Sequence, residues 1–164
     1  MLKYSKLQDS RSAKAPMATT CHLSLDAMGT PVDQKVYRSM IGSLLYLCAS
    51  RPDIMLGVGV CAWYQAALKE SHLVAVKRNF WYLVDTPNYG LWYPKSSNFS
   101  LCGYTDSDWA GDKDDRKSTS GACHFLGRSL VCWSSKKHNC VSVSMTEAEY
   151  VAVASCCTQL LWMR

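Results

Sequence analysis

The chain has 164 residues and a formal net charge of +5, with 48% hydrophobic and 19% charged residues. This length suits one ordinary domain, or a small domain plus part of a second. The composition excludes an intrinsically disordered chain and predicts a protein with a buried core. The longest apolar run, residues 54–63, is too short to span a bilayer, so we expect no membrane partner. The first sixteen residues lack the apolar stretch of a secretory signal, which predicts an intracellular protein, cytoplasmic or nuclear.

The positive charge is concentrated in the first hundred residues, which hold eleven Lys and Arg against six Asp and Glu. Residues 101–164 hold seven of each and are balanced. An excess of this size fits contact with a polyanion in the first part of the chain. It fits a protein without a nucleic-acid partner equally well.

The nine cysteines form no C-x-x-C pair and no Cys/His group with zinc spacing. Most lie inside apolar runs. We therefore expect small, buried, reduced side chains rather than a disulfide framework.

Residues 1–33 are polar and lack a sustained period, which predicts a loose leader or connecting segment. Residues 34–95 are predicted to form a small helical unit. A helix begins near Gln34, a second covers 53–67 after Pro52 breaks the ladder, and a third starts at Ser71 as its N-cap and ends near 86–88. The apolar face expected for the first helix comprises Val36, Met40, Ile41, Leu44, Leu45, Leu47 and Cys48.

Residues 96–164 are predicted to form a separate β-rich domain, which makes the chain an α+β protein. Strands are expected at 90–94, 99–110, 120–127 and 129–136, the last two joined by a turn at Gly127-Arg128. Residues 139–144 fit either a short strand or the approach to a helix. That helix starts at Ser144, with Glu147 completing a capping box. Its expected apolar face comprises Tyr150, Val153, Ala154, Cys157, Leu160 and Leu161.

Two carboxylates on the strand at 99–110 are candidate metal ligands, and ordinary exposed strand carboxylates are the alternative. Asp106 and Asp108 are two residues apart and would share a strand face, in a type of element where Asp is depleted. The apolar residues around them suggest a central strand. Glu147 and Glu149 cannot both face the sheet, since residues two apart on a helix diverge by about 200°. With Glu147 assigned to the cap, Glu149 is left for a site, although a solvated glutamate of the first turn fits its position as well.

Basic residues mark two candidate phosphate contacts. The loop 111–121 lacks the ligand spacing of an EF-hand, and a solvated turn competes with phosphate contact by Arg116 and Lys117. Lys77 and Arg78, beside two aromatic residues on the third helix, fit a nucleic-acid backbone or an ordinary charged helix face.

Taken together, six stretches closely resemble the Pol polyprotein of copia-type long-terminal-repeat retrotransposons, a kind abundant in plants. The resemblance covers most of residues 14–164. The stretches are YRSMIGSLLYLCASRPDIM (37–55), KESHLVAVKR (69–78), TPNYGLWYPK (86–95), GYTDSDWAGDKDDRKSTSG (103–121), VCWSSKK (131–137) and TEAEYVAVA (146–154).

The resemblance implies the end of a reverse transcriptase region and its connection, followed by the first part of a ribonuclease H (RNase H) domain. Such a domain folds as a mixed sheet with packed helices and cuts the RNA strand of an RNA–DNA hybrid, using two divalent metal ions. By position, the catalytic metal ligands are Asp106 and Glu149, with Asp108 as a lesser candidate. Oxygen ligands imply Mg²⁺ or Mn²⁺.

The chain departs from this family in ways that bear on activity. Two further carboxylates and the last elements of the domain would fall after Arg164, and the paired aspartates of the polymerase are absent. Trp63 and Trp81 stand where the family has basic residues, and Val84-Asp85 replaces Lys-Gly. We therefore expect a truncated polyprotein fragment that is inactive alone. A non-catalytic nucleic-acid-binding or assembly fragment, or a functionless remnant of a decayed element, are the alternatives.

Overall fold

The computed structural model describes residues 12–18, 23–95 and 99–164, and the chain divides into two compact units, Met1–Gly90 and Leu91–Arg164. The first unit is helical, and the second is a sheet with one helix, which confirms the α+β class. None of the helices in the described ranges is long and apolar enough to cross a membrane. The elements are α1 (Gln34–Leu47), η2 (Pro52–Ile54), α2 (Met55–Trp63), α3 (Glu70–Asp85), β1 (Leu101–Ser107), β2 (Thr119–Leu126), β3 (Ser129–Lys137) and α4 (Met145–Met163).

Helix α1 starts one residue after Asp33, whose Oδ1 accepts a hydrogen bond from the backbone N–H of Lys35 at 2.8 Å. Its buried face was predicted only in part. Val36 and Leu45 are exposed, whereas Tyr37, which the prediction omits, is fully buried. Tyr37 is held there because its hydroxyl donates to the carbonyl of Cys61 at 2.7 Å, so the polar end of the ring is satisfied inside the core.

Helices α2 and α3 differ from the prediction at their ends. Pro52 opens the short 3₁₀ turn η2, and α2 stops at Trp63, earlier than the apolar pattern suggests. Helix α3 starts before Ser71, because Lys69 is the N-cap and His72 Nδ1 accepts from its backbone N–H at 3.1 Å. Ser71 instead donates its hydroxyl to Asp26 at 2.6 Å, which ties the preceding segment to this helix.

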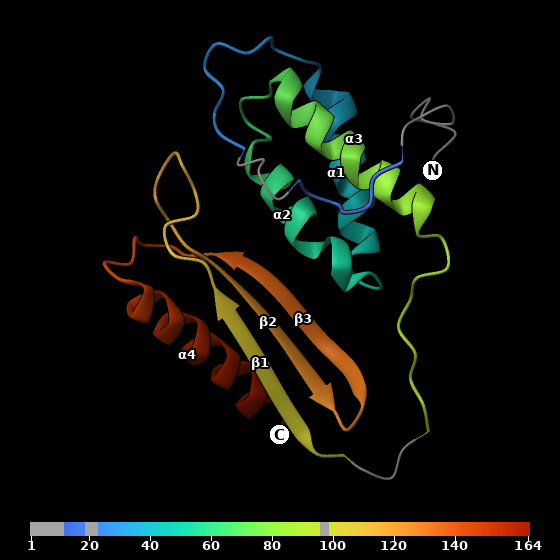
Figure 1. Cartoon of the computed structure of the whole chain (residues 1–164), viewed down its shortest axis with the longest axis vertical. Helices are drawn as coiled ribbons and strands as arrows, with labels where there is room; N and C mark the ends of the chain where they lie inside the picture. The colour runs from blue at the N-terminus through green and yellow to red at the C-terminus, as the bar shows by residue number, and fades with distance from the viewer. Residues whose placement is uncertain (1–11, 19–22, 96–98) are drawn as a thin grey trace. The chain divides into compact units, whose positions relative to one another are not determined.

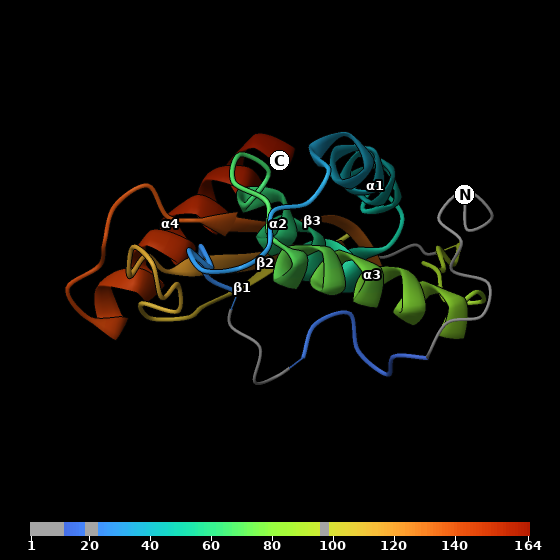
Figure 2. The same cartoon turned by 90° about the horizontal axis from the view of Figure 1, so that it is seen from above.

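The three helices pack side by side around one apolar core (Figures 1 and 2). Residues 12–18 and 23–33 contain no helix or ladder strand, apart from an isolated bridge between Pro31 and Lys69. Of the predicted leader, residues 1–11 and 19–22 lie outside the described residues. The fully buried large apolar side chains of the core are Tyr37, Ile41, Leu44, Ile54, Val58 and Val76.

The second unit is a three-stranded antiparallel sheet in the order β1-β2-β3. The turn at Gly127-Arg128 is present, with Gly127 at φ 61°. Three predictions were wrong within the described residues. No strand forms at 90–94, β1 lies at an edge of the sheet rather than at its centre, and the sheet is antiparallel rather than mixed. Residues 139–144 lead into α4.

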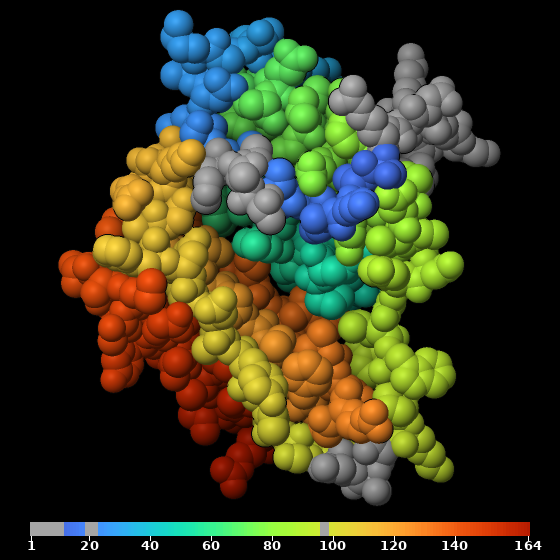
Figure 3. Space-filling model, in the orientation of Figure 1, coloured from blue at the N-terminus to red at the C-terminus, as the bar shows by residue number. Residues whose placement is uncertain are grey.

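Helix α4 runs along one face of this sheet (Figures 1 and 2), and in Figure 3 its red surface lies beside the yellow band of β1. Ser144 is confirmed as the N-cap, but the reciprocal bond of the predicted capping box goes to the residue before the N-cap rather than to Ser144 itself. Ser144 Oγ accepts from the N–H of Glu147 at 3.2 Å, and Glu147 Oε2 accepts from the N–H of Val143 at 2.6 Å. The predicted apolar face of α4 was wrong. The buried row is Ala148, Ala152 and Cys156, whereas Tyr150, Val153, Ala154, Cys157 and Leu161 are exposed.

The cysteines are only partly buried, which corrects the expectation from sequence. Cys48, Cys61 and Cys156 are buried, and the other described cysteines are exposed or half-buried. The eight cysteines in the described ranges form no disulfide with one another. Cys21 lies outside the described residues.

Candidate functional site

Asp106 lies on the face of β1 that is turned away from α4. A Cβ on Gly103 would meet Cys156 Sγ and Leu160 Cδ1, both at 2.9 Å, so the side of Gly103 is the side that α4 covers. The ladder between β1 and β2 is regular, and side chains alternate along it. Asp106, three residues further on, therefore points to the opposite, exposed side, where its register partner is Gly121.

Asp108 lies beyond the end of β1 and closes the loop that follows, so it does not share a strand face with Asp106. Its backbone N–H donates to Thr119 O at 3.1 Å, and its Oδ1 accepts from the N–H of Thr119. A Cβ on Gly111 would lie 2.0 Å from Asp108 Oδ2, so a larger residue at this position would have to displace the carboxylate. The Asp108 carboxylate therefore helps to join the two ends of the loop 109–118.

Glu149 is half-buried near the start of α4, and the neighbouring Glu147 is occupied by the cap. Helix α4 runs antiparallel to β1, because Cys156 and Leu160 lie by Gly103 while Trp109 Nε1 donates to Ser142 O at 3.1 Å. Glu149 and Asp106 therefore lie toward the same end of the sheet, but on different sides of β1. Among the described residues, no group of three or more Asp, Glu, His or Cys side chains is placed to hold a metal ion.

The loop 109–118 is organised by Asp112, a residue that the sequence analysis did not select. Asp112 is only 8% exposed, and its Oδ1 accepts from the backbone N–H groups of Asp114 at 2.7 Å and Asp115 at 3.2 Å. Its Oδ2 accepts from Lys137 Nζ at 2.6 Å. Local sequence offers a signal for the amide bonds, since Asp commonly binds amides two and three residues ahead. The bond to Lys137 has no such local signal, because Lys137 lies twenty-five residues further along the chain.

The pKa values of Asp112 and Lys137 are shifted in the directions expected for an ion pair. Burial alone raises the pKa of Asp112, but hydrogen bonds from Lys137 and the two amides outweigh it and hold the pKa below its ordinary value. Burial lowers the pKa of Lys137, and its bonds to Asp112 and Asp115 reverse this and raise it. Both groups are therefore charged near neutral pH, and the pair has a structural role.

The predicted phosphate contacts are not equivalent. Arg116 is exposed, with a backbone φ of 57°, whereas Lys117 is half-buried and lies 3.7 Å from Asp115. Lys77 is half-buried on α3. Arg78 already has a partner within the chain, because its Nε donates to the carbonyl of Ala15 at 3.1 Å.

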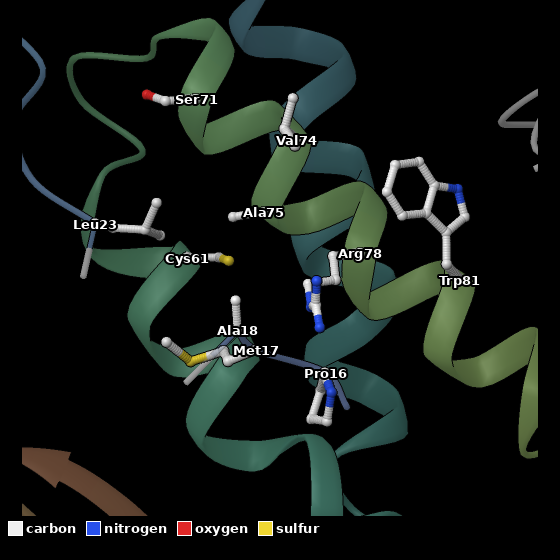
Figure 4. A pocket seen from close by; sticks show the side chains of 10 residues that line it. All are labelled: Pro16, Met17, Ala18, Leu23, Cys61, Ser71, Val74, Ala75, Arg78 and Trp81. Atoms are coloured by element: carbon white, nitrogen blue, oxygen red, sulfur yellow. The ribbon is translucent and has the colours of Figure 1, made fainter. Parts of the chain in front are cut away.

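Arg78 also lines a cavity of about 140 Å³ in the helical unit, where Figure 4 shows it close to Pro16. The remaining lining is mostly apolar and includes Cys61 and Trp81. One guanidinium that already binds the leader segment does not make this cavity a phosphate site.

A second polar cluster in the helical unit was also missed from sequence. Arg51 is buried and binds Asp53 through two nitrogens, Nε to Oδ1 at 2.9 Å and Nη2 to Oδ2 at 2.7 Å. The same guanidinium donates to Thr86 O at 3.0 Å and Thr86 Oγ1 at 2.7 Å, while the Tyr82 hydroxyl donates to Asp53 Oδ2 at 2.8 Å. This cluster joins η2 to the end of α3 and leaves little of Arg51 for a ligand.

The chain is similar over nearly its whole length to retrotransposon polyproteins. It is 40% identical over 163 residues to the "Retrovirus-related Pol polyprotein from transposon RE1" of Arabidopsis thaliana, which is 99% of this chain and 11% of that protein. It is 33% identical over 171 residues to the "Retrovirus-related Pol polyprotein from transposon TNT 1-94" of Nicotiana tabacum, with 13% of that protein covered. The chain thus spans roughly a ninth of the length of the polyprotein from RE1.

A much shorter relative is also similar. The "Secreted RxLR effector protein 161" of Plasmopara viticola is 38% identical over 128 residues, which cover 77% of this chain and 90% of that protein. No family model and no solved structure matches the chain.

Proposed function

Because this chain belongs to the family of copia-type retrotransposon Pol polyproteins, we propose that it is a polyprotein segment carrying a helical connection and part of an RNase H-type domain. The whole-length similarity to the polyproteins from RE1 and TNT 1-94 is the observation that supports this most strongly. The order of elements in the second unit is compatible with it. Three antiparallel strands precede one helix, with Asp106 on the first strand and Glu149 near the start of the helix, toward the same end of the sheet.

The described residues do not by themselves fit a two-metal site. Mg²⁺ or Mn²⁺ needs several converging oxygen ligands. Asp106 and Glu149 supply suitable oxygens but lie on different sides of β1, and Asp108 is held by the amide of Thr119. In this proposal Asp106 and Glu149 are ligands of a site that needs carboxylates from a longer polyprotein. The segment alone does not cleave RNA.

The test is cleavage of a labelled RNA–DNA hybrid by the 164-residue chain and by a longer polyprotein that includes it, each with Mg²⁺ or Mn²⁺. We expect no metal-dependent cleavage by the chain alone. In the longer protein, Asp106→Asn and Glu149→Gln should each remove cleavage, whereas Asp114→Asn in the exposed part of the loop should not. Cleavage by the chain alone that Asp106→Asn abolishes would refute the inactivity. Full cleavage by the longer protein carrying Asp106→Asn would refute the assignment of Asp106 as a metal ligand.

A second candidate function is binding of nucleic acid without catalysis, with an RNA–DNA hybrid as the partner. The exposed guanidinium of Arg116 and the +5 charge of the first hundred residues favour it. The same hybrid, titrated at several salt concentrations, should then bind with an affinity that falls steeply as salt rises. Absence of binding at low salt would remove this candidate and favour a remnant without function.

A further inference from the structure

Helix α4 carries a second apolar surface in addition to the one that packs on the sheet. No charged residue occurs between Tyr150 and Met163. The sheet side buries Ala148, Ala152 and Cys156, yet Tyr150 is 72% and Leu161 73% exposed on the other side. A helix that is apolar all round is normally covered on both sides. The outer side of α4 is therefore a surface that lacks a partner within the described part of this unit.

The outer side is arranged as a heptad seam, defined by six residues. Successive members are three, four, three, four and three positions apart, the spacing of residues that line a helix–helix contact. The seam has charged residues at its two ends and uncharged residues between them. Its members are Glu147, Tyr150, Ala154, Cys157, Leu161 and Arg164.

This seam is complementary to itself when reversed. We infer that the outer side of α4 pairs with the same surface of a second copy of this chain, with the two helices antiparallel. The two-fold axis then passes between Ala154 and Cys157. Tyr150 lies against Leu161 of the second copy, and Ala154 against Cys157 of the second copy. Glu147 lies against Arg164 of the second copy, and each of these contacts occurs twice.

Charge and size both favour this register. The reversed pairing joins two opposite charges at each end, while a parallel pairing would place Glu147 against itself and Arg164 against itself. Glu147 uses Oε2 for its cap and has Oε1 for a partner. Each charge also suits its own end of the helix, a carboxylate near the N-terminus and a guanidinium at the C-terminus. The small Ala154 and Cys157 at the centre let the helices approach closely, and the larger Tyr150 and Leu161 pack on either side.

The test is sedimentation equilibrium of the full chain over a concentration series under reducing conditions. A single helix pair buries less surface than a standard interface, so we expect a reversible dimer with a dissociation constant on the order of micromolar. Leu161→Arg should raise that constant by at least about tenfold. Trp162→Arg is the matched control, because Trp162 is the next residue on the same helix, is 81% exposed and lies off the seam. It should leave the dimer intact.

Arg164→Glu tests the register, since it would face Glu147 of the second copy and should weaken the dimer. Lys136→Glu makes the same charge change away from the helix and should have no effect. Helix content measured by circular dichroism identifies any variant that misfolds, and Leu161→Ala then replaces Leu161→Arg. A chain that stays monomeric throughout the series would overturn the inference. Equal weakening by Trp162→Arg and Leu161→Arg, or no weakening by Arg164→Glu, would do so too.

Discussion

The two units bury different kinds of side chain. The helical unit encloses large apolar residues such as Ile41, Ile54 and Phe80, while the apolar residues buried in the second unit are small, chiefly alanines of α4. Large apolar groups of the second unit, such as Tyr104 and Trp162, are exposed. Its buried interior instead includes polar side chains, among them Asp112, Ser118, His124 and His138. The comparison shows that a high apolar content does not by itself make a large core. The helical unit therefore buries its large apolar side chains more completely than the second unit does.

The largest effect expected from this comparison is in the helical core. Leu44 is fully buried and its neighbour Leu45 is 46% exposed. Leu44→Ala should therefore lower the free energy of unfolding of the helical unit by about 3 kcal/mol, through lost burial and a cavity. Leu45→Ala should cost less than about 1 kcal/mol. Urea unfolding followed by helix content measures both. Similar losses for the two variants would contradict the assignment of this core.

A smaller effect, and one that depends on pH, is expected in the second unit. Because the pKa of Asp112 is lowered by folding, its contribution to stability is present above the unfolded value of about 3.9. It is lost as pH falls through the lower folded pKa. Asp112→Asn should cost about 2 kcal/mol at pH 7, and the difference from the unmodified chain should shrink in strong acid. Urea unfolding of the second unit at several pH values measures this.

The matched pair for the same prediction lies on β3. Lys137→Gln removes the partner of Asp112 and should reproduce most of the loss at pH 7. Lys136→Gln changes an exposed neighbour and should not. A stability difference between Asp112→Asn and the unmodified chain that is constant from neutral pH to strong acid would exclude the ion pair as its source.

The smallest effect concerns the packing between β1 and α4. Gly103→Ala places a methyl group against Cys156 and Leu160 and should cost about 1–2 kcal/mol. Gly121→Ala, on the next strand, has open space around its Cβ and should be neutral or slightly stabilising. Thermal unfolding of the second unit compares them. A neutral Gly103→Ala would contradict the face assignment on which the orientation of Asp106 depends.

Much of the fold was predictable from sequence, because hydrophobic periodicity identifies its elements and Pro, Gly and capping residues mark where they begin and end. The break at Pro52, the N-cap at Ser144 and the turn at Gly127 were all predicted correctly. The buried face of α4 was not, since a helix with no charge between Tyr150 and Met163 offers no periodic contrast by which to choose a side.

The candidate site was less predictable than the fold. The type and spacing of carboxylates identify Asp106 and Glu149, but their orientation depends on which side of β1 the helix α4 covers. That choice is made by contacts between residues far apart in sequence, such as those of Cys156 and Leu160 with the strand at Gly103. The pairing of Asp112 with Lys137 escaped prediction for the same reason. Asp106 and Glu149 remain predictions as metal ligands.

The loop 109–118 shows that a dense run of charges need not be mobile. It contains three sites for a trypsin-like protease, at Lys113, Arg116 and Lys117. Its backbone amides are engaged nonetheless. The N–H groups of residues 110, 112, 114, 115, 116 and 117 all donate hydrogen bonds within the loop. A protease must bind its substrate in extended form, so these bonds must break before cleavage. We therefore expect trypsin to cut at these three sites slowly.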